Sequence, residues 1–92
     1  MIHFLVHGKD DNVAVAVAEV SKGQRGKGLN MSTKKDFEIQ VLTDIPLGHK
    51  IALKDLKVDD TIIKYDHDIG RVVAAISRGE HVHVHNLKTR RW

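Results

Sequence analysis

Short runs of alternating apolar and polar residues, broken by frequent turn residues, limit what this chain can fold into more than any other feature. Residues 36–42 alternate cleanly, and residues 13–18 alternate valine with alanine. A period of two favours a strand over a helix, and the β-branching of valine outweighs the helix propensity of alanine. Turn residues rich in Gly, Asp, Asn and Ser lie at positions 8–12, 44–48, 66–68 and 77–79. We therefore expect an all-β fold, a small barrel or clip, with at most one or two short helical turns.

The same patterns assign the remaining segments. Residues 2–7 and 13–18 flank a turn and predict a hairpin. Residues 21–30 contain three glycines among Lys, Arg and Gln and indicate a mobile loop, whereas residues 51–56 can hold one helical turn at most. Strands are expected over residues 61–65, 69–76 and 81–86.

Size and composition exclude several classes of protein. The 92 residues fit one domain, residues 1–92. A domain of this size buries only roughly 60–65% of the surface that its unfolded chain exposes, so docking onto a partner would stabilise it considerably. The absence of cysteine excludes disulfides, thiolate metal sites and a cysteine nucleophile, and fits a reducing cytoplasm. No apolar run approaches the ~18 residues of a membrane span. The net charge of +3 is mild and lacks interleaved aromatic residues, so we expect no nucleic-acid partner.

Three histidines near the C-terminus form the strongest chemical pattern. In an extended strand His81, His83 and His85 would project from one face, about 7 Å apart, while Val82 and Val84 would project from the other. Neutral imidazole is a common metal ligand, so the row could begin a zinc or iron site. It could equally contact an anionic substrate or a partner chain, or have no role.

Two shorter groups carry charge that suits an anion. His49 and Lys50 follow a glycine that allows a tight turn, and Lys64 and Tyr65 end a strand. Each group alone is also compatible with an ordinary basic turn. The sequence shows no Ser-His-Asp pattern and no paired carboxylates, so we assign no catalytic residue and expect no complete catalytic apparatus.

Taken in order, the motifs resemble a known family. The motifs are Gly-His-Lys at residues 48–50, Ile-Lys-Tyr at 63–65, Ile-Gly at 69–70 and Gly-Glu-His-Val-His-Val-His-Asn at 79–86. This combination resembles the SAF-type β-clip module of the altronate and galactarate dehydratase family over nearly the whole chain from residue 12 onward. The opening at residues 2–7 and the basic, Trp-ended tail at residues 85–92 resemble the small subunit of the branch that eliminates sulfite. Asp66 departs from the family, which usually has glycine there.

The resemblance implies a lyase subunit that acts with a larger partner. Family members perform β-elimination on small anionic hydroxy acids, and the large catalytic subunit is expected to hold the iron (Fe²⁺) and supply most of the catalytic groups. A free-standing β-clip binding module is the alternative from another class. Substrate contacts are then expected at His49, Lys50, Lys64, Tyr65, His81, His83, His85 and Asn86.

Overall fold

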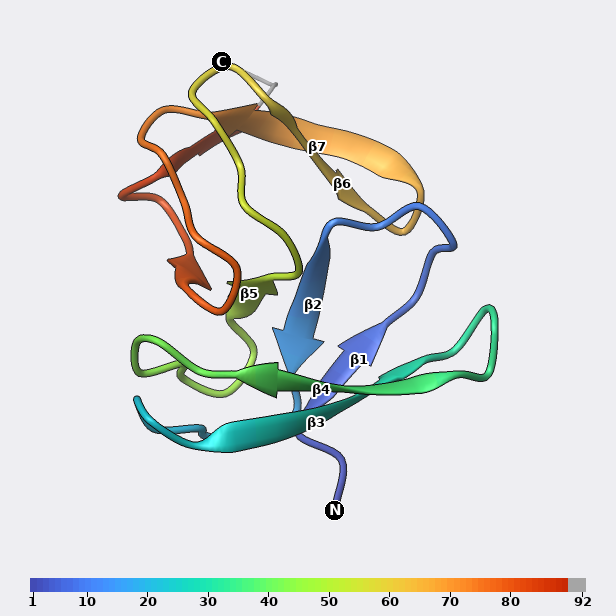
Figure 1. The fold of residues 1–92 in the computed structure, drawn as a ribbon. Coiled ribbons are helices and arrows are strands. Elements are labelled where there is room, and N and C mark those ends of the chain that lie inside the picture. The colour runs from blue at the N-terminus through green and yellow to red at the C-terminus, as the bar shows by residue number, and fades with distance from the viewer. Residues whose placement is uncertain (90–92) are drawn as a thin grey trace.

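The computed structural model describes residues 1–89, which form nine β-strands and no helix (Figure 1). The strands are β1 (Phe4–Val6), β2 (Val13–Ala16), β3 (Arg25–Asn30), β4 (Asp36–Gln40), β5 (Lys50–Ala52), β6 (Thr61–Lys64), β7 (His67–Val72), β8 (His81–Val82) and β9 (Leu87–Thr89). The expected all-β fold is confirmed. None of the described residues lies in a helix with the length and hydropathy that crossing a membrane would require. Part of the predicted basic tail, residues 90–92, lies outside the described residues.

Two sheets make up the fold. The larger sheet has the strand order β4-β3-β1-β2-β5-β8 and curls as it crosses the molecule, and the smaller has the order β6-β7-β9 (Figure 1). The expected hairpin of β1 and β2 is confirmed by antiparallel pairing of Phe4 with Ala16. Strands β1 and β3 pair in parallel, whereas every other strand pair is antiparallel.

The central strands β2 and β5 separate two hydrophobic cores. Ala14 and Ile51 face a core that also contains Phe4, whereas Val13 and Ala52 face the second core. Burial on both faces explains why these strands consist almost entirely of apolar residues. It also corrects the helical turn expected at residues 51–56: a helix there could not present consecutive residues to opposite cores, and β5 pairs with both β2 and β8.

The glycine-rich segment is a strand over much of its length, so the mobile loop predicted for residues 21–30 is wrong. A Cβ atom on Gly26 would lie 2.5 Å from the ring of Phe4, and one on Gly28 would lie 2.1 Å from the ring of Phe37. The glycines therefore make room for two aromatic rings packed against the strand, which offsets their poor strand propensity.

The final predicted strand is also shorter than expected. Strand β8 ends at Val82, and residues 83–86 form a turn before β9. Val82 is fully buried, as predicted, but Val84 is 78% exposed, so the expectation that both valines share one inner face is wrong. The turn between β6 and β7 is shifted as well: it comprises Tyr65 and Asp66, because β7 already begins at His67.

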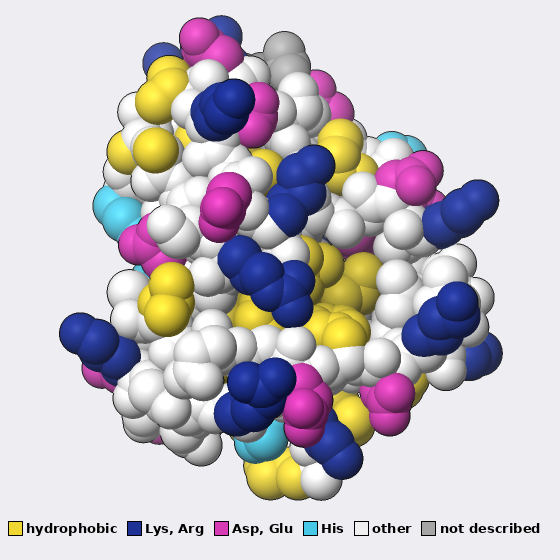
Figure 2. Space-filling model, in the orientation of Figure 1, with side chains coloured by type: hydrophobic (Ala, Val, Ile, Leu, Met, Phe, Trp, Pro, Cys, Tyr) yellow, Lys and Arg dark blue, Asp and Glu magenta, His cyan; other side chains and the backbone are white. Residues whose placement is uncertain are grey.

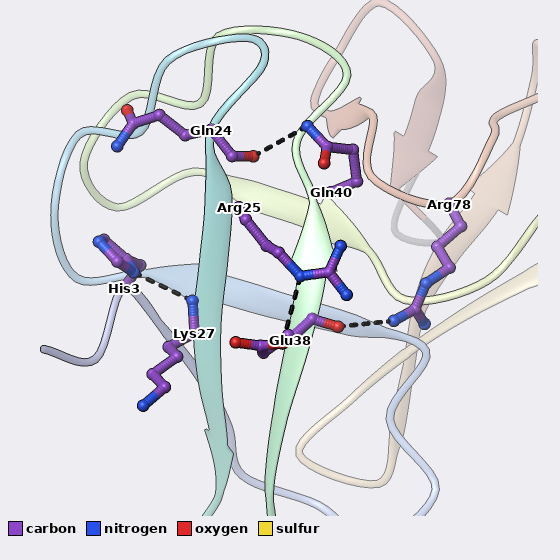
Figure 3. A network of polar contacts seen from close by, with 7 residues as sticks. All are labelled: His3, Gln24, Arg25, Lys27, Glu38, Gln40 and Arg78. Atoms are coloured by element: carbon purple, nitrogen blue, oxygen red, sulfur yellow. Dashed lines mark hydrogen bonds and ion pairs between the residues drawn. The ribbon is translucent and has the colours of Figure 1, made fainter.

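Arg78 fastens the start of β8 to distant backbone. Its guanidinium donates to the carbonyl oxygens of Leu53, at 2.5 Å, and Glu38, at 3.2 Å. Figure 3 shows this side chain reaching the backbone of β4 beside the ion pair of Arg25 and Glu38, whose nitrogen and oxygen are 3.2 Å apart. Arg78 thus ties three segments together through carbonyl groups rather than through a carboxylate.

A hollow opens on the face shown in Figure 2, with hydrophobic side chains on its floor and Lys and Arg side chains beside it. A cavity of about 170 Å³ lies here between β1, β4 and the end of β5. Its lining residues are Val6, Asp11, Asn30, Phe37, Leu53 and Arg78. None of the site residues predicted from the sequence lies in this lining.

Candidate functional site

Four histidines from two chain segments gather where β5 and β8 pair. The register sets Lys50 opposite Val82, so His49 lies just before β5 and His83 just after β8, across from each other. The rings of His49 and His83 stack with centroids 4.2 Å apart, and Nδ1 of His49 lies 2.8 Å from Nε2 of His81. The rings of His81 and His85 are 5.2 Å apart. We call His49, His81, His83 and His85 the imidazole cluster.

Asn86 holds the turn that carries two of these rings. Its side chain is buried; its Oδ1 accepts from the amide of His83 at 3.0 Å, and its Nδ2 donates to the carbonyl of His81 at 2.8 Å. The amide of Asn86 also donates to the carbonyl of His83 at 3.0 Å. A side chain that bonds back to nearby backbone in this way stabilises a turn, which is why the strand ends at Val82. Asn86 therefore acts on the cluster by placing His81 and His83.

Three members of the cluster could hold a metal ion. One ring nitrogen from each of His49, His81 and His83 lies within 4.8 Å of the others. Histidine nitrogens bound to one metal at ~2.0–2.1 Å lie about 3.3 Å apart in a tetrahedral arrangement, so a small rotation of the rings would suffice. The trio expected from the sequence was His81, His83 and His85, but the structure brings His49 into the group.

Burial and neighbouring positive charge favour the neutral forms of His81 and His83. Burial, followed by the charge of His49, lowers the pKa of both His81 and His83. Neutral imidazole can bind a metal, accept a proton or accept a hydrogen bond at neutral pH. His81 and His83 are therefore suited to ligation or proton transfer rather than to carrying fixed positive charge.

Two lysines extend the site away from the cluster. Lys50 is half-buried in β5, and burial followed by the positive charge of Lys64 lowers its pKa. The ion pairs among residues 1–89 join Arg25 with Glu38 and Arg71 with Asp59, so neither Lys50 nor Lys64 has a carboxylate partner there. Two ammonium groups close enough to repel each other favour a ligand with negative charge.

Tyr65 stands beside Lys64 and stacks on a residue that the sequence did not single out. The Lys64 ammonium lies 5.3 Å from the centroid of the Tyr65 ring, and the ring of His7 stacks on Tyr65 at 4.2 Å. His7 and Tyr65 are 58 positions apart. Because only the fold brings them together, no local pattern could have identified His7.

Comparison with known proteins places this chain in a family. Residues 2–90 match the altronate/galactarate dehydratase SAF domain. The chain is 52% identical to (2R)-sulfolactate sulfo-lyase subunit alpha of Chromohalobacter salexigens over 99% of this chain and 98% of the relative. It is 54% identical to the subunit of the same name from Paracoccus pantotrophus over 66% of this chain and 91% of the relative.

A longer relative contains the same module. The chain is 44% identical to altronate dehydratase of Bacillus subtilis over 97% of this chain but only 17% of that enzyme. The names of the two shorter relatives imply a second subunit in those enzymes. On the match of residues 2–90 and the end-to-end similarity, this chain belongs to the altronate/galactarate dehydratase SAF domain family.

Proposed function

We propose that this chain is the small subunit of a lyase that converts (2R)-3-sulfolactate to pyruvate and sulfite. The observation that carries the proposal is the end-to-end similarity, at 52% identity, to a sulfolactate sulfo-lyase alpha subunit. A large catalytic subunit is the partner, and the cysteine-free composition suits a complex in the cytoplasm.

The proposed reaction is a β-elimination. A base removes the proton from C2, the C–H electron pair forms the C2=C3 double bond, and the C3–S bond breaks with its electrons leaving on sulfite. The enol product then gains a proton at C3 and loses the proton of its C2 hydroxyl, which gives pyruvate. Such a reaction needs a base, a group that stabilises the developing enolate, and positive charge for the leaving sulfite.

The site supplies groups that suit a dianionic substrate. Lys50 and Lys64 have no carboxylate partner among residues 1–89, so both can meet the carboxylate and sulfonate groups. Neutral His81 and His83 offer a proton acceptor or donor beside them. In this proposal His49, His85 and Tyr65 complete the contacts, and Asn86 keeps the cluster in place.

Iron, expected mainly on the large subunit, is compatible with the donor set found here. The nitrogen donors of His49, His81 and His83 are of a type that binds iron as well as zinc. These three residues would supply ligands on this chain if a metal sits between the subunits. A bound divalent metal would act as a Lewis acid that polarises a substrate oxygen.

The test is co-expression of this chain with the large subunit of a sulfolactate sulfo-lyase, followed by purification of the complex. We expect sulfite release from sulfolactate by the complex and none by either chain alone. The 44% identity to altronate dehydratase favours one alternative, so dehydration of altronate and galactarate is measured in parallel. Activity on the sugar acids alone would replace the sulfo-lyase assignment, and a chain that binds no large subunit would indicate a β-clip binding module.

A further inference from the structure

The two-residue turn between β6 and β7 has the type I′ backbone common in hairpins, but two non-glycine residues adopt it. Tyr65 and Asp66 are consecutive and have φ angles of 55° and 59°. This left-handed region favours glycine, and a bulky residue such as Tyr65 is uncommon there. Such strain persists only where the surrounding structure enforces it, and it tends to occur at functional sites.

Asp11 is the residue that enforces this turn. Its Oδ2 accepts from the amide of Tyr65 at 2.9 Å and of Gly8 at 3.0 Å, and its Oδ1 accepts from the amide of Asp66 at 2.7 Å. Burial raises the pKa of the Asp11 carboxyl, but the hydrogen bonds from these amides outweigh it and leave the pKa lowered. A Cβ on Gly8 would lie 2.5 Å from the Asp66 amide nitrogen, so glycine lets the two loops approach.

The result of this clamp is a fixed pair of rings. Tyr65 is one of the residues that Asp11 holds, and His7 directly precedes another, Gly8. The rings of His7 and Tyr65 lie 19° from parallel with centroids 4.2 Å apart. The Tyr65 hydroxyl lies 3.4 Å from Nε2 of His7. Lys64, at the end of β6, places its ammonium beside the same ring and has no ion-pair partner in the described chain.

We propose that His7, Lys64 and Tyr65 form a subsite for an oxyanion, with Asp11 as the residue that positions it. When Nε2–H of His7 donates to the phenol oxygen, the phenol O–H is free to donate to a ligand oxygen beside the Lys64 ammonium. The inference rests on the proposed function for the identity of the ligand, which would be the carboxylate or the sulfonate of the substrate. Two residues that carried no prediction, His7 and Asp11, thereby become part of the site.

Tyr65 is the single tyrosine of the chain, which allows a direct test on the full chain without any activity. The ring resonances of Tyr65 are followed by NMR in chain labelled with ¹³C-tyrosine, while sodium sulfate, sodium acetate or sodium chloride is added at matched ionic strength. Sulfate stands for a sulfonate and acetate for a carboxylate. We expect a saturable shift with sulfate or acetate and none with chloride.

Variants then separate the subsite from simple loop anchoring. His7→Gln and Asp11→Asn should each weaken the apparent affinity about tenfold or more, which corresponds to about 1.4 kcal/mol or more. Asp60→Asn is the matched control, because Asp60 also accepts a backbone amide in a turn, that of Lys57 at 2.8 Å, but contacts neither ring. In the Asp11→Asn chain, Asp66→Gly should restore part of the binding, since glycine removes the strain at one of the two left-handed positions.

The proposal is overturned if no oxyanion shifts the Tyr65 resonances saturably, or if His7→Gln and Asp11→Asn bind as the unmodified chain does. In the complex, Tyr65→Phe should raise KM for sulfolactate about fivefold or more with kcat within twofold, as loss of ground-state binding predicts. An unchanged kcat/KM would also contradict it. If the complex releases no sulfite, the proposed reaction fails, while the resonance titration still decides whether the subsite exists.

Discussion

Replacing Asn86 with alanine should destabilise the chain far more than any other change in its turn. The side chain makes two hydrogen bonds, to the amide of His83 and the carbonyl of His81, and only 7% of the residue is exposed. Each such bond contributes about 0.5–1.5 kcal/mol, and removing the Asn86 side chain also leaves its half-buried backbone partners without that bond, so we expect a loss of about 2–3 kcal/mol. For a domain of this size that corresponds to a fall in Tm of about 10–20 °C.

Urea unfolding of the full chain measures this loss, provided that the slope with denaturant is unchanged. Val84→Ala is the matched control, because Val84 lies in the same turn but is 78% exposed, and it should change stability by no more than about 0.5 kcal/mol. The imidazole resonances of His81 and His83 should shift in Asn86→Ala and stay in place in Val84→Ala. An Asn86→Ala chain as stable as the unmodified one, or an equal loss in both variants, would refute the assignment of Asn86 as the support of the cluster.

Further expectations concern pH, glycine and catalysis. The pKa values of His81 and His83 are lowered in the folded chain, so the unfolded chain binds protons more readily. The free energy of unfolding should therefore be highest above the ordinary histidine pKa of about 6.5 and should decrease as pH falls through the lowered values. Unfolding midpoints measured between pH 7.5 and 5 at constant ionic strength check this, and midpoints that do not change with pH would contradict it. Gly79→Ala should destabilise the chain by well over the ~1–2 kcal/mol that a left-handed alanine costs, because the new Cβ would lie 2.2 Å from the carbonyl oxygen of Gln40. Gly48→Ala should cost only the ~1–2 kcal/mol of the left-handed backbone, because the space around its new Cβ is open. Equal melting temperatures of the two variants would contradict the steric argument. The isolated chain should show no turnover of sulfolactate even with iron present. In the complex, His83→Ala should lower kcat about 100-fold, as expected when a group that stabilises developing charge is lost. Its stability in melting curves should stay within ~0.5 kcal/mol of that of the unmodified chain. Normal turnover would mean that the reaction takes place elsewhere.

Much of the fold could be predicted because β-branched residues with a period of two mark strands that lie against a core. The strand predicted over residues 36–42 is confirmed over residues 36–40, and the hairpin around residues 8–12 is confirmed as well. The glycine-rich strand β3 could not be identified this way, because its stabilisation comes from the rings of Phe4 and Phe37, which are supplied by other strands. Local propensity carries no information about such partners.

The candidate site shows the same division between local and distant information. The row at residues 81–85 was visible because its members are neighbours in sequence, but an alternating pattern cannot reveal that Asn86 bends the backbone back after Val82. The inclusion of His49 in the metal-compatible trio depends on the pairing of β5 with β8, across 32 positions. Grouping His49 with the row therefore required the fold.

The contact between Arg78 and the backbone of β4 bears on how the open edge of the larger sheet is protected from pairing with another chain. Strand β4 is the last strand of an open sheet, and an exposed edge invites pairing with the edge of another chain. The guanidinium of Arg78 occupies the carbonyl of Glu38, one of the acceptors that an incoming strand would need, and the amide of Leu42 just beyond β4 is taken by the carbonyl of Gly79. Removing Arg78 would free that acceptor and so expose the sheet to edge-to-edge aggregation. The effect would be seen as aggregation at high protein concentration rather than as a change in the activity of the site.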